Sequence, residues 1–93
     1  MSFENVTLKA AHKRSIHHRP EIESSVNCGC FYCCTTFIPS AIKEWVDDND
    51  TAICPQCDID SIVGDASGYP VTDPEFLSAM HQFWFERTVD ASN

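Results

Sequence analysis

The strongest regular pattern of apolar residues lies near the end of the chain. Five apolar residues recur at the spacing of one helical face: Phe76, Leu77, Met80, Phe83 and Trp84. Residues 72–75 match a capping box and place Pro74 in the first turn. The pattern predicts an amphipathic C-terminal helix over residues 72–88, with His81 and Phe85 off its apolar face.

The start of the chain has a weaker helical pattern. Residues 5–19 are mostly polar, and their few apolar positions form a narrow stripe, which predicts a helix that frays or needs a partner. Pro20 suits the first turn of a second short helix, and Glu21 and Glu23 favour the positive end of its dipole. We therefore expect a helical N-terminal arm over residues 1–27, with its second helix at residues 20–25.

Short elements of both kinds are predicted in the middle of the chain. Residues 35–38 are β-branched and aromatic, which predicts a strand, and a second short strand is expected at residues 51–54. Between them, Ile42, Trp45 and Val46 have helical spacing behind a Ser40 cap, which predicts a helix over residues 40–46. The acidic residues 47–50 predict a tight loop before the second strand.

A third short helix is predicted after residue 57. Ile59, Ile62 and Val63 stand at helical spacing, and Gly64 follows as a stop signal. Residues 65–70 contain Gly and Pro and predict a loop.

The chemistry of the chain is concentrated in its six cysteines. Two tetrapeptides, CFYC and CPQC, stand twenty residues apart. Two residues between cysteines allow a tight turn to direct both sulfurs at one ion, and structural zinc takes four such ligands in a tetrahedron. The spacing predicts one structural Zn²⁺ ion held by Cys30, Cys33, Cys54 and Cys57.

Other ligand sets remain open from the sequence. Cys28 could replace Cys30, although that would lose the tight turn, whereas Cys34 would point away from a site that Cys33 faces. We expect both to be buried small residues or neighbours of the site. Three histidines of the arm are further candidate ligands, namely His12, His17 and His18.

Charge is unevenly divided along the chain. Residues 1–20 hold four Lys or Arg and one acid, a net charge of +3, whereas residues 21–93 hold two Lys or Arg and thirteen acids, a net charge of −11. An acidic body repels phosphate backbones, which disfavours nucleic-acid binding through it. The N-terminus has no apolar signal segment and no stretch reaches the length of a membrane span, so we expect a cytoplasmic protein whose thiols stay reduced.

The two cysteine turns carry a resemblance to known zinc proteins. With a hairpin-like excursion between them and a short helix expected to start at the second, they resemble treble-clef and zinc-ribbon fingers, and CPQC is similar to the knuckle of rubredoxin. The segments CGCFYC, EWVD, TAICPQC and DIDSIVGDASGYP look like a family of small uncharacterised bacterial cytoplasmic proteins, over residues 12–85. That family implies no mechanism.

The chain departs from the zinc-knuckle and rubredoxin pattern after the second cysteine of each turn. Cys34 and Asp58 stand where glycine is often found. Glycine there lets backbone N–H groups approach the metal-bound sulfur, so its absence argues against use as an iron redox centre.

The expected fold is a single small α+β zinc-binding domain spanning residues 1–93. Its core, residues 28–64, would be a treble-clef or zinc-ribbon-like four-cysteine unit with a short β-hairpin, flanked by the N-terminal helical arm and the C-terminal amphipathic helix.

We predict no catalytic residues, because no nucleophile or phosphate-binding motif is present. Asp58 and Asp60 are explained by their place in the first turn of the helix predicted after residue 57, where acids favour the helix dipole.

The preferred functional hypothesis is a non-catalytic, zinc-stabilised protein–protein interaction module. Its acidic surface would bind a basic protein surface, in a sharper form as an inhibitor or immunity-type protein. Five aromatic residues are candidate anchors for the partner, namely Phe31, Tyr32, Trp45, Trp84 and Phe85. The alternative is a nucleic-acid-binding zinc-finger protein that uses the basic arm, with Lys9, Lys13, Arg14 and Arg19 as its cations.

Overall fold

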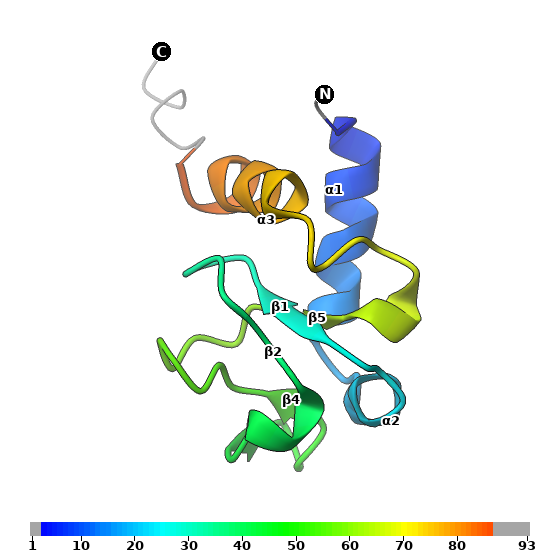
Figure 1. Cartoon of the computed structure of the whole chain (residues 1–93), viewed down its shortest axis with the longest axis vertical. Coiled ribbons are helices and arrows are strands. Elements are labelled where there is room, and N and C mark those ends of the chain that lie inside the picture. Colours follow the sequence, from blue (N-terminus) through cyan, green and yellow to red (C-terminus); the bar gives the residue numbers. More distant parts are fainter. Residues whose placement is uncertain (1–2, 87–93) are drawn as a thin grey trace.

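A small three-stranded sheet lies between a pair of helices and a cysteine-bearing lobe in the computed structural model, which describes residues 3–86 (Figure 1). The sheet is antiparallel in the order β2-β1-β5, with β1 at Cys28–Cys30, β2 at Thr36–Phe37 and β5 at Ile62–Gly64. A separate two-stranded sheet pairs β3, Trp45–Val46, with β4, Thr51–Ala52. The fold is therefore a small α+β arrangement, as the sequence predicts.

The helices follow the sequence pattern at both ends of the chain. α1 spans Asn5–His12 and continues into a 3-10 turn at Lys13–Ser15, while α2 spans Arg19–Glu23. α3 spans Pro74–His81 and passes into a π-helical turn at Gln82–Glu86, so the predicted residues 87 and 88 lie outside the described residues. Further 3-10 turns occur at Pro39–Ala41 and Asp65–Ser67. No helix among the described residues has the length and apolar character needed to cross a membrane.

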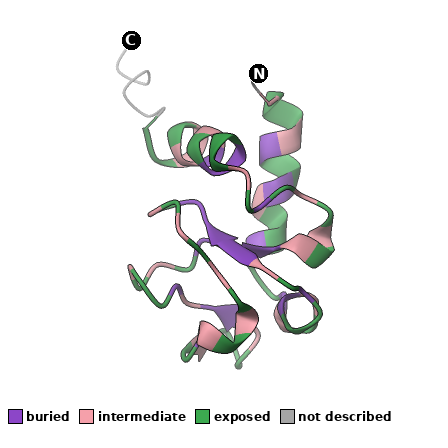
Figure 2. Ribbon diagram, viewed as in Figure 1, coloured by how far each residue is buried: buried purple, intermediate pink, exposed green. Residues whose placement is uncertain are grey.

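Two strands of the central sheet are buried on both faces, because every residue of β1 and β5 is buried, whereas β2 is not buried (Figure 2). One face adjoins a set of residues that we call the helical cluster: Leu8, Ala11, Phe31, Val63, Val71, Phe76, Leu77 and Met80. The other face adjoins the knuckle cluster: Ile22, Cys28, Cys30, Ile42, Ala52, Cys54 and Ile62. Successive strand residues point to opposite faces, and neighbouring residues of β5 accordingly join different clusters.

Two glycines allow the sheet to be approached closely from each side. A Cβ on Gly29 would lie 2.6 Å from the carbonyl oxygen of Val71, on the side of the helical cluster. A Cβ on Gly64 would lie 2.3 Å from the hydroxyl of Ser25, on the other side. Both contacts are shorter than a real Cβ tolerates, so these positions require the absence of a side chain.

The apolar face of α3 packs as predicted in its first two turns. Phe76, Leu77 and Met80 are buried, whereas Phe83 and Trp84 are partly buried against the same cluster. Asp73 is the N-cap residue and accepts the N–H of Glu75, so the helix begins one residue later than the capping box at Thr72 implied. The turn that follows α3 leaves Phe85 exposed, as the pattern indicated.

The predicted helix over residues 40–46 is wrong. Only Pro39–Ala41 form a 3-10 turn, and the chain is then extended into β3. Trp45 pairs with Ala52, and the guanidinium of Arg19 covers the Trp45 ring at 4.2 Å. A seven-residue segment gains little from helix formation alone, so tertiary pairing decides its conformation.

The predicted helix after residue 57 is also wrong. Ile62 and Val63 are both buried because they lie on opposite faces of β5, a strand that is covered on both sides. A short apolar run of this kind has the same sequence signature as a buried helical turn. The second cysteine pair is therefore followed by a strand that returns to β1.

Candidate metal centre

Each pair of cysteines lies in a turn of the same construction. In the first turn, the N–H of Cys34 donates to the carbonyl of Cys30 at 2.8 Å, and the N–H of Tyr32 approaches the Cys30 sulfur at 3.4 Å. In the second, the N–H of Asp58 donates to the carbonyl of Cys54 at 3.0 Å, and the N–H of Gln56 approaches the Cys54 sulfur at 3.3 Å. We call residues 30–34 the first knuckle and residues 54–58 the second knuckle.

The residue after each second cysteine adopts the conformation usually given to glycine. Cys34 has a φ of 61° and Asp58 a φ of 66°, both in the left-handed region. Backbone N–H groups reach the sulfurs all the same, so the missing glycines do not keep N–H donors away from the site. These N–H groups belong to Tyr32 and Gln56, which precede the second cysteine of each turn, so the interpretation against an iron redox centre stays a prediction.

The four predicted cysteines meet at one place. Their sulfur atoms all lie within 4.8 Å of one another, with 3.6 Å from Cys30 to Cys57 and 3.7 Å from Cys33 to Cys54. A tetrahedral ion with metal–sulfur bonds of about 2.3 Å requires sulfurs about 3.8 Å apart. The donor set and its spacing therefore fit a single tetrahedral metal ion, and these four residues could hold one.

Backbone bonds fix each knuckle to the sheet or to its own lobe. The N–H of Cys30 donates to the carbonyl of Thr35, and the N–H of Cys54 donates to that of Ile59, each at 2.9 Å. The N–H of Phe31 donates to the carbonyl of Ser61 at 3.0 Å, so the chain entering β5 is tied to the first knuckle. Pairing of β5 with β1 thus brings the second knuckle back to the first.

The thiols differ in their surroundings. Cys30 and Cys54 are fully buried, whereas Cys33 and Cys57 are partly exposed. Burial raises the pKa of Cys30, and burial likewise raises the pKa of Cys57 to about 11. Burial also acts to raise the pKa of Cys33, but hydrogen bonds from Thr35 and the neighbouring thiols outweigh it and lower this pKa to about 7. Because metals bind thiolates, occupation of the site would release protons.

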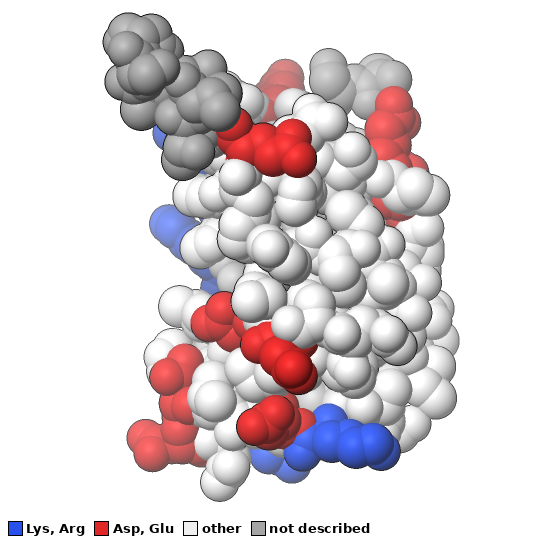
Figure 3. Space-filling model, turned by 90° about the vertical axis from the view of Figure 1, so that its left-hand side faces the viewer, with Lys and Arg blue, Asp and Glu red and all other residues white. Residues whose placement is uncertain are grey.

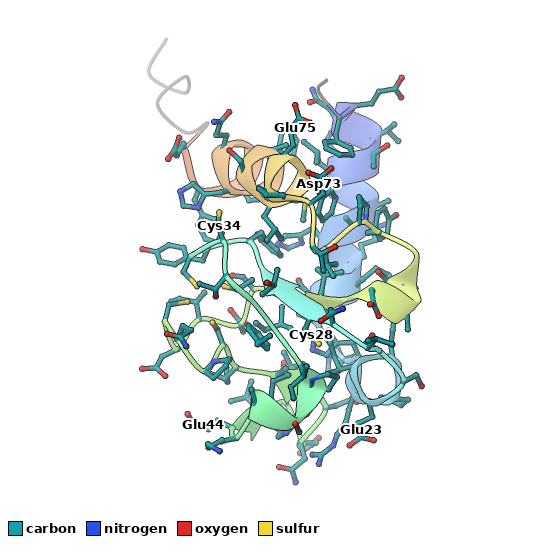
Figure 4. All side chains as sticks on the ribbon, in the orientation of Figure 1. Glu23, Cys28, Cys34, Glu44, Asp73 and Glu75 are labelled. Atoms are coloured by element: carbon teal, nitrogen blue, oxygen red, sulfur yellow. The ribbon has the colours of Figure 1, made fainter. Side chains whose placement is uncertain are left out.

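Neither of the other two cysteines belongs to the group of four. Cys28 is fully buried at the start of β1, where burial raises the pKa of its thiol to about 12. Cys34 is exposed and lies just below α3 in the view of Figure 4. Of the two alternatives expected for these cysteines, Cys28 is a buried small residue, whereas Cys34 is not buried and is a neighbour of the site, where its N–H donates to the carbonyl of Cys30.

The three histidines of the arm make contacts other than with the four cysteines. The ring of His12 lies 4.0 Å from that of Trp84, and His17 Nδ1 lies 3.6 Å from a carboxylate oxygen of Asp50. His18 is buried, and its Nδ1 donates to the carbonyl of Arg14 at 2.7 Å while its Nε2 accepts the N–H of Ala52 at 3.0 Å. His18 therefore ties the arm to β4, which leads into the second knuckle.

The supporting contacts of two residues near the site were not predicted from the sequence. The Thr35 hydroxyl lies 3.0 Å from the Cys33 sulfur, and the His18 ring spans the gap between the arm and β4. Thr35 was assigned to a strand and His18 to a helix, and no spacing rule relates either residue to the cysteines. A Thr two residues after a knuckle cysteine is the one local feature that could have drawn attention.

Comparison with protein-family models, with curated proteins and with solved structures finds no match to this chain.

Proposed function

We propose that the four cysteines bind one structural Zn²⁺ ion in a zinc-ribbon-like unit. Four sulfur ligands at tetrahedral spacing with no open position favour a structural over a catalytic ion. The strand β5 after the second knuckle favours a zinc ribbon, since a treble clef would continue there as a helix. Six free thiols among the described residues suit a reducing compartment, and we place the protein in the cytoplasm.

We further propose that this zinc-built scaffold is a non-catalytic module that binds a basic surface of another protein. The main support is the excess of unpaired acidic side chains in the part of the chain that bears the knuckles, residues 28–64, which we call the acidic lobe. Residues 28–64 contain six acids and one Lys or Arg, a net charge of −5. Figure 3 shows acidic groups gathered over the lower part of the face that carries this lobe. Four thiolates with Zn²⁺ would add about two negative charges.

Few of these acids are used to hold the fold. Among residues 3–86, no hydrogen bond or ion pair is formed by the carboxylates of Glu44, Asp47, Asp48 and Asp58. By contrast, the carboxylate of Asp65 accepts the N–H groups of Val26 and Asn27. Unpaired surface acids cost a domain self-repulsion, and they favour the approach of a positively charged partner.

The basic arm is less suited to bind phosphates than its composition implies. Arg14 is paired with Glu21, and Arg19 donates to Glu23 at 2.8 Å and to the carbonyl of Asn49 at 3.1 Å. A phosphate would have to displace these carboxylates before it could use either guanidinium. These contacts favour the protein-binding function over the nucleic-acid alternative.

Capture from cell extract with a charge-reversed control tests this function. The zinc-loaded chain is compared with an Asp47→Lys/Asp48→Lys variant and with Glu4→Lys, a single reversal on a different face of the fold. We expect a basic protein that is held by the first and third baits and lost with the second, and whose association rate falls as salt rises.

Three results would contradict the proposal. Retention of the same partner by the Asp47→Lys/Asp48→Lys variant would exclude the acidic lobe as its binding surface. Capture of DNA or RNA that disappears in a Lys9→Ala/Lys13→Ala variant would establish the arm as the functional surface instead. Metal-dependent turnover of any substrate would also exclude a non-catalytic role.

A further inference from the structure

An exposed group of aromatic rings lies beside the first knuckle. Tyr32 and Phe85 are 42% and 38% exposed, and their ring centroids are 4.9 Å apart in an edge arrangement. The His81 ring completes the group, at 5.7 Å from Tyr32 and 5.5 Å from Phe85. We call these three residues the aromatic cluster. Its members come from a knuckle and from the end of α3, two segments about fifty residues apart.

Contacts with the first knuckle and with the buried core fix the aromatic cluster in place. The N–H of Tyr32 approaches the Cys30 sulfur, and Nδ1 of His81 donates to the carbonyl of Phe31 at 3.2 Å. The Phe85 ring also lies 5.8 Å from the buried Phe31 ring. Exposed aromatic side chains that are fixed in this way lose little entropy when a partner binds, because their orientation is already set.

The surroundings of the aromatic cluster are negatively charged. The carboxylate of Glu86 lies 3.1 Å from Nε2 of His81, and its side chain is 59% exposed. Among residues 3–86, no Lys or Arg forms an ion pair or a cation–π contact with the cluster. A face with ring surfaces and a carboxylate is complementary to a planar cation.

The chain already builds one site of this composition for its own arginine. The Arg19 guanidinium lies 4.2 Å from the centroid of the Trp45 ring, while it donates to the Glu23 carboxylate and to the Asn49 carbonyl. A ring face and a nearby carboxylate are the essential parts of that contact. The aromatic cluster with Glu86 has the same parts, and the described residues supply it with no Lys or Arg, since the Glu86 carboxylate faces the ring of His81.

We propose that the aromatic cluster binds an arginine side chain from a partner protein, stacked on Tyr32 or Phe85 and paired with Glu86. The inference rests on the proposed function, because it names the contact through which a basic protein surface is recognised. The acidic lobe steers the basic partner at long range, and the aromatic cluster supplies the short-range contact. Arginine is preferred to lysine, because its flat guanidinium can stack and pair at the same time.

Titration of the zinc-loaded full chain with a short glycine–arginine repeat peptide tests the proposal by backbone NMR. We expect the largest shift changes at residues 32, 81, 85 and 86, and weaker binding of the matched glycine–lysine peptide. A Tyr32→Leu/Phe85→Leu variant keeps apolar bulk but removes the rings. It should bind the arginine peptide about threefold to thirtyfold more weakly, the range given by one cation–π contact. Glu86→Gln should also weaken binding, whereas Val26→Ala, at a residue 72% exposed elsewhere on the surface, should not.

The outcomes separate the inference from the proposed function. Unchanged affinity in the leucine double variant, with zinc content and melting temperature retained, would overturn the aromatic cluster while leaving a basic-protein function intact. Shift changes confined to residues 44–50 would do the same. Binding of neither peptide, together with no basic partner in the capture experiment, would overturn both. Single-stranded RNA that shifts residues 32 and 85 more than the arginine peptide does would identify base stacking and overturn the proposal.

Discussion

The two sides of the central sheet are stabilised by different means. Six of the eight residues in the helical cluster are large side chains with almost no exposed surface: Phe31, Val63, Val71, Phe76, Leu77 and Met80. In the knuckle cluster only Ile22 and Ile62 meet that description, and three of the seven members are cysteines. Apolar burial is therefore extensive on one side, whereas the other side has less apolar volume and contains the four cysteines that could hold a metal ion.

β1 is the element through which the two sides affect each other. Cys30 belongs to the knuckle cluster and Phe31, its neighbour in sequence, to the helical cluster. A displaced first knuckle would therefore withdraw a large ring from the apolar core. The same adjacency connects the aromatic cluster to the first knuckle, because the Phe85 ring lies 5.8 Å from that of Phe31.

The largest effect should come from loss of the metal. Cys54→Ser should yield protein without zinc whose amide signals between residues 28 and 64 lose dispersion. Zinc binding contributes about 10–16 kcal/mol in small zinc-dependent units, which is comparable to the whole stability of a domain, about 5–15 kcal/mol. Metal content by mass spectrometry, with Co²⁺ spectra for tetrahedral thiolate ligation, provides the measurement.

Cys34→Ser is the matched control for this change. The thiol of Cys34 is exposed and outside the group of four, so the variant should keep its zinc and its melting temperature. Equal metal content and stability in Cys54→Ser and Cys34→Ser would refute the ligand set. Strong chelators and acid should unfold the wild type in step with metal loss.

A large truncation in the helical cluster should lower stability without removing the metal. Phe76 is fully buried, and Phe76→Ala should cost about 3–5 kcal/mol in the free energy of unfolding. Trp84 is only partly buried, with Nε1 donating to the carbonyl of Leu8 at 3.3 Å, so Trp84→Phe should cost about 1 kcal/mol. Chemical denaturation of the zinc-loaded proteins gives both values. Zinc loss in folded Phe76→Ala would show that the two sides are not separately stabilised.

The sequence predicted the elements of the helical side better than those of the knuckle side. α3 could be predicted because its pattern of apolar residues is long and agrees with the signals for the start of a helix, which gives several independent indications of one structure. Two segments are too short to be assigned in this way, residues 40–46 and 59–63. The spacing of their apolar residues fits both a helix and a strand buried on two sides. Pairing with β4 and β1 decides between them, and pairing between distant segments is invisible in a local pattern.

The candidate site shows the same division between local and distant information. The cysteine spacing favoured the four sulfurs that meet in the structure, because two tight turns suit one tetrahedral ion, although it left Cys28 and the histidines open as alternatives. The contacts of His18 and Thr35 could not be predicted in this way. His18 contacts β4 thirty-four residues away, and the left-handed conformation of Cys34 and Asp58 contradicts the usual preference for glycine.

Acidification should loosen the attachment of the arm to the knuckle side. Burial lowers the pKa of His18 below 6.5, while the Arg14 carbonyl and the charges of Glu21 and Asp50 oppose this and His17 adds to it. The neutral ring is the form that accepts the Ala52 N–H. Its contribution to stability is therefore fully present above about pH 6.5 and is lost as the pH falls toward the lowered pKa.

The pH effect is measured as the difference between wild type and His18→Gln in the free energy of unfolding. Wild type should lose stability relative to the variant as the pH drops, whereas at neutral pH it should be the more stable of the two. His17→Gln serves as the control, because the His17 side chain is 63% exposed. Parallel pH profiles for wild type and His18→Gln would mean that His18 titrates alike in the folded and unfolded chains.

The smallest predicted effect is a gain in stability on the knuckle side. Asp58 holds a φ of 66°, which an L-residue adopts at some cost and glycine adopts freely. Asp58→Gly should therefore stabilise the zinc-loaded protein by about 0.5–1 kcal/mol, provided that the added freedom of glycine in the unfolded chain costs less than the strain relieved. Asp58→Asn is the matched control, since it removes the same charge but keeps a side chain. If only Asp58→Gly raises the melting temperature, the gain in stability comes from relief of backbone strain. If both variants raise it equally, the gain comes from reduced repulsion among the acids of the lobe.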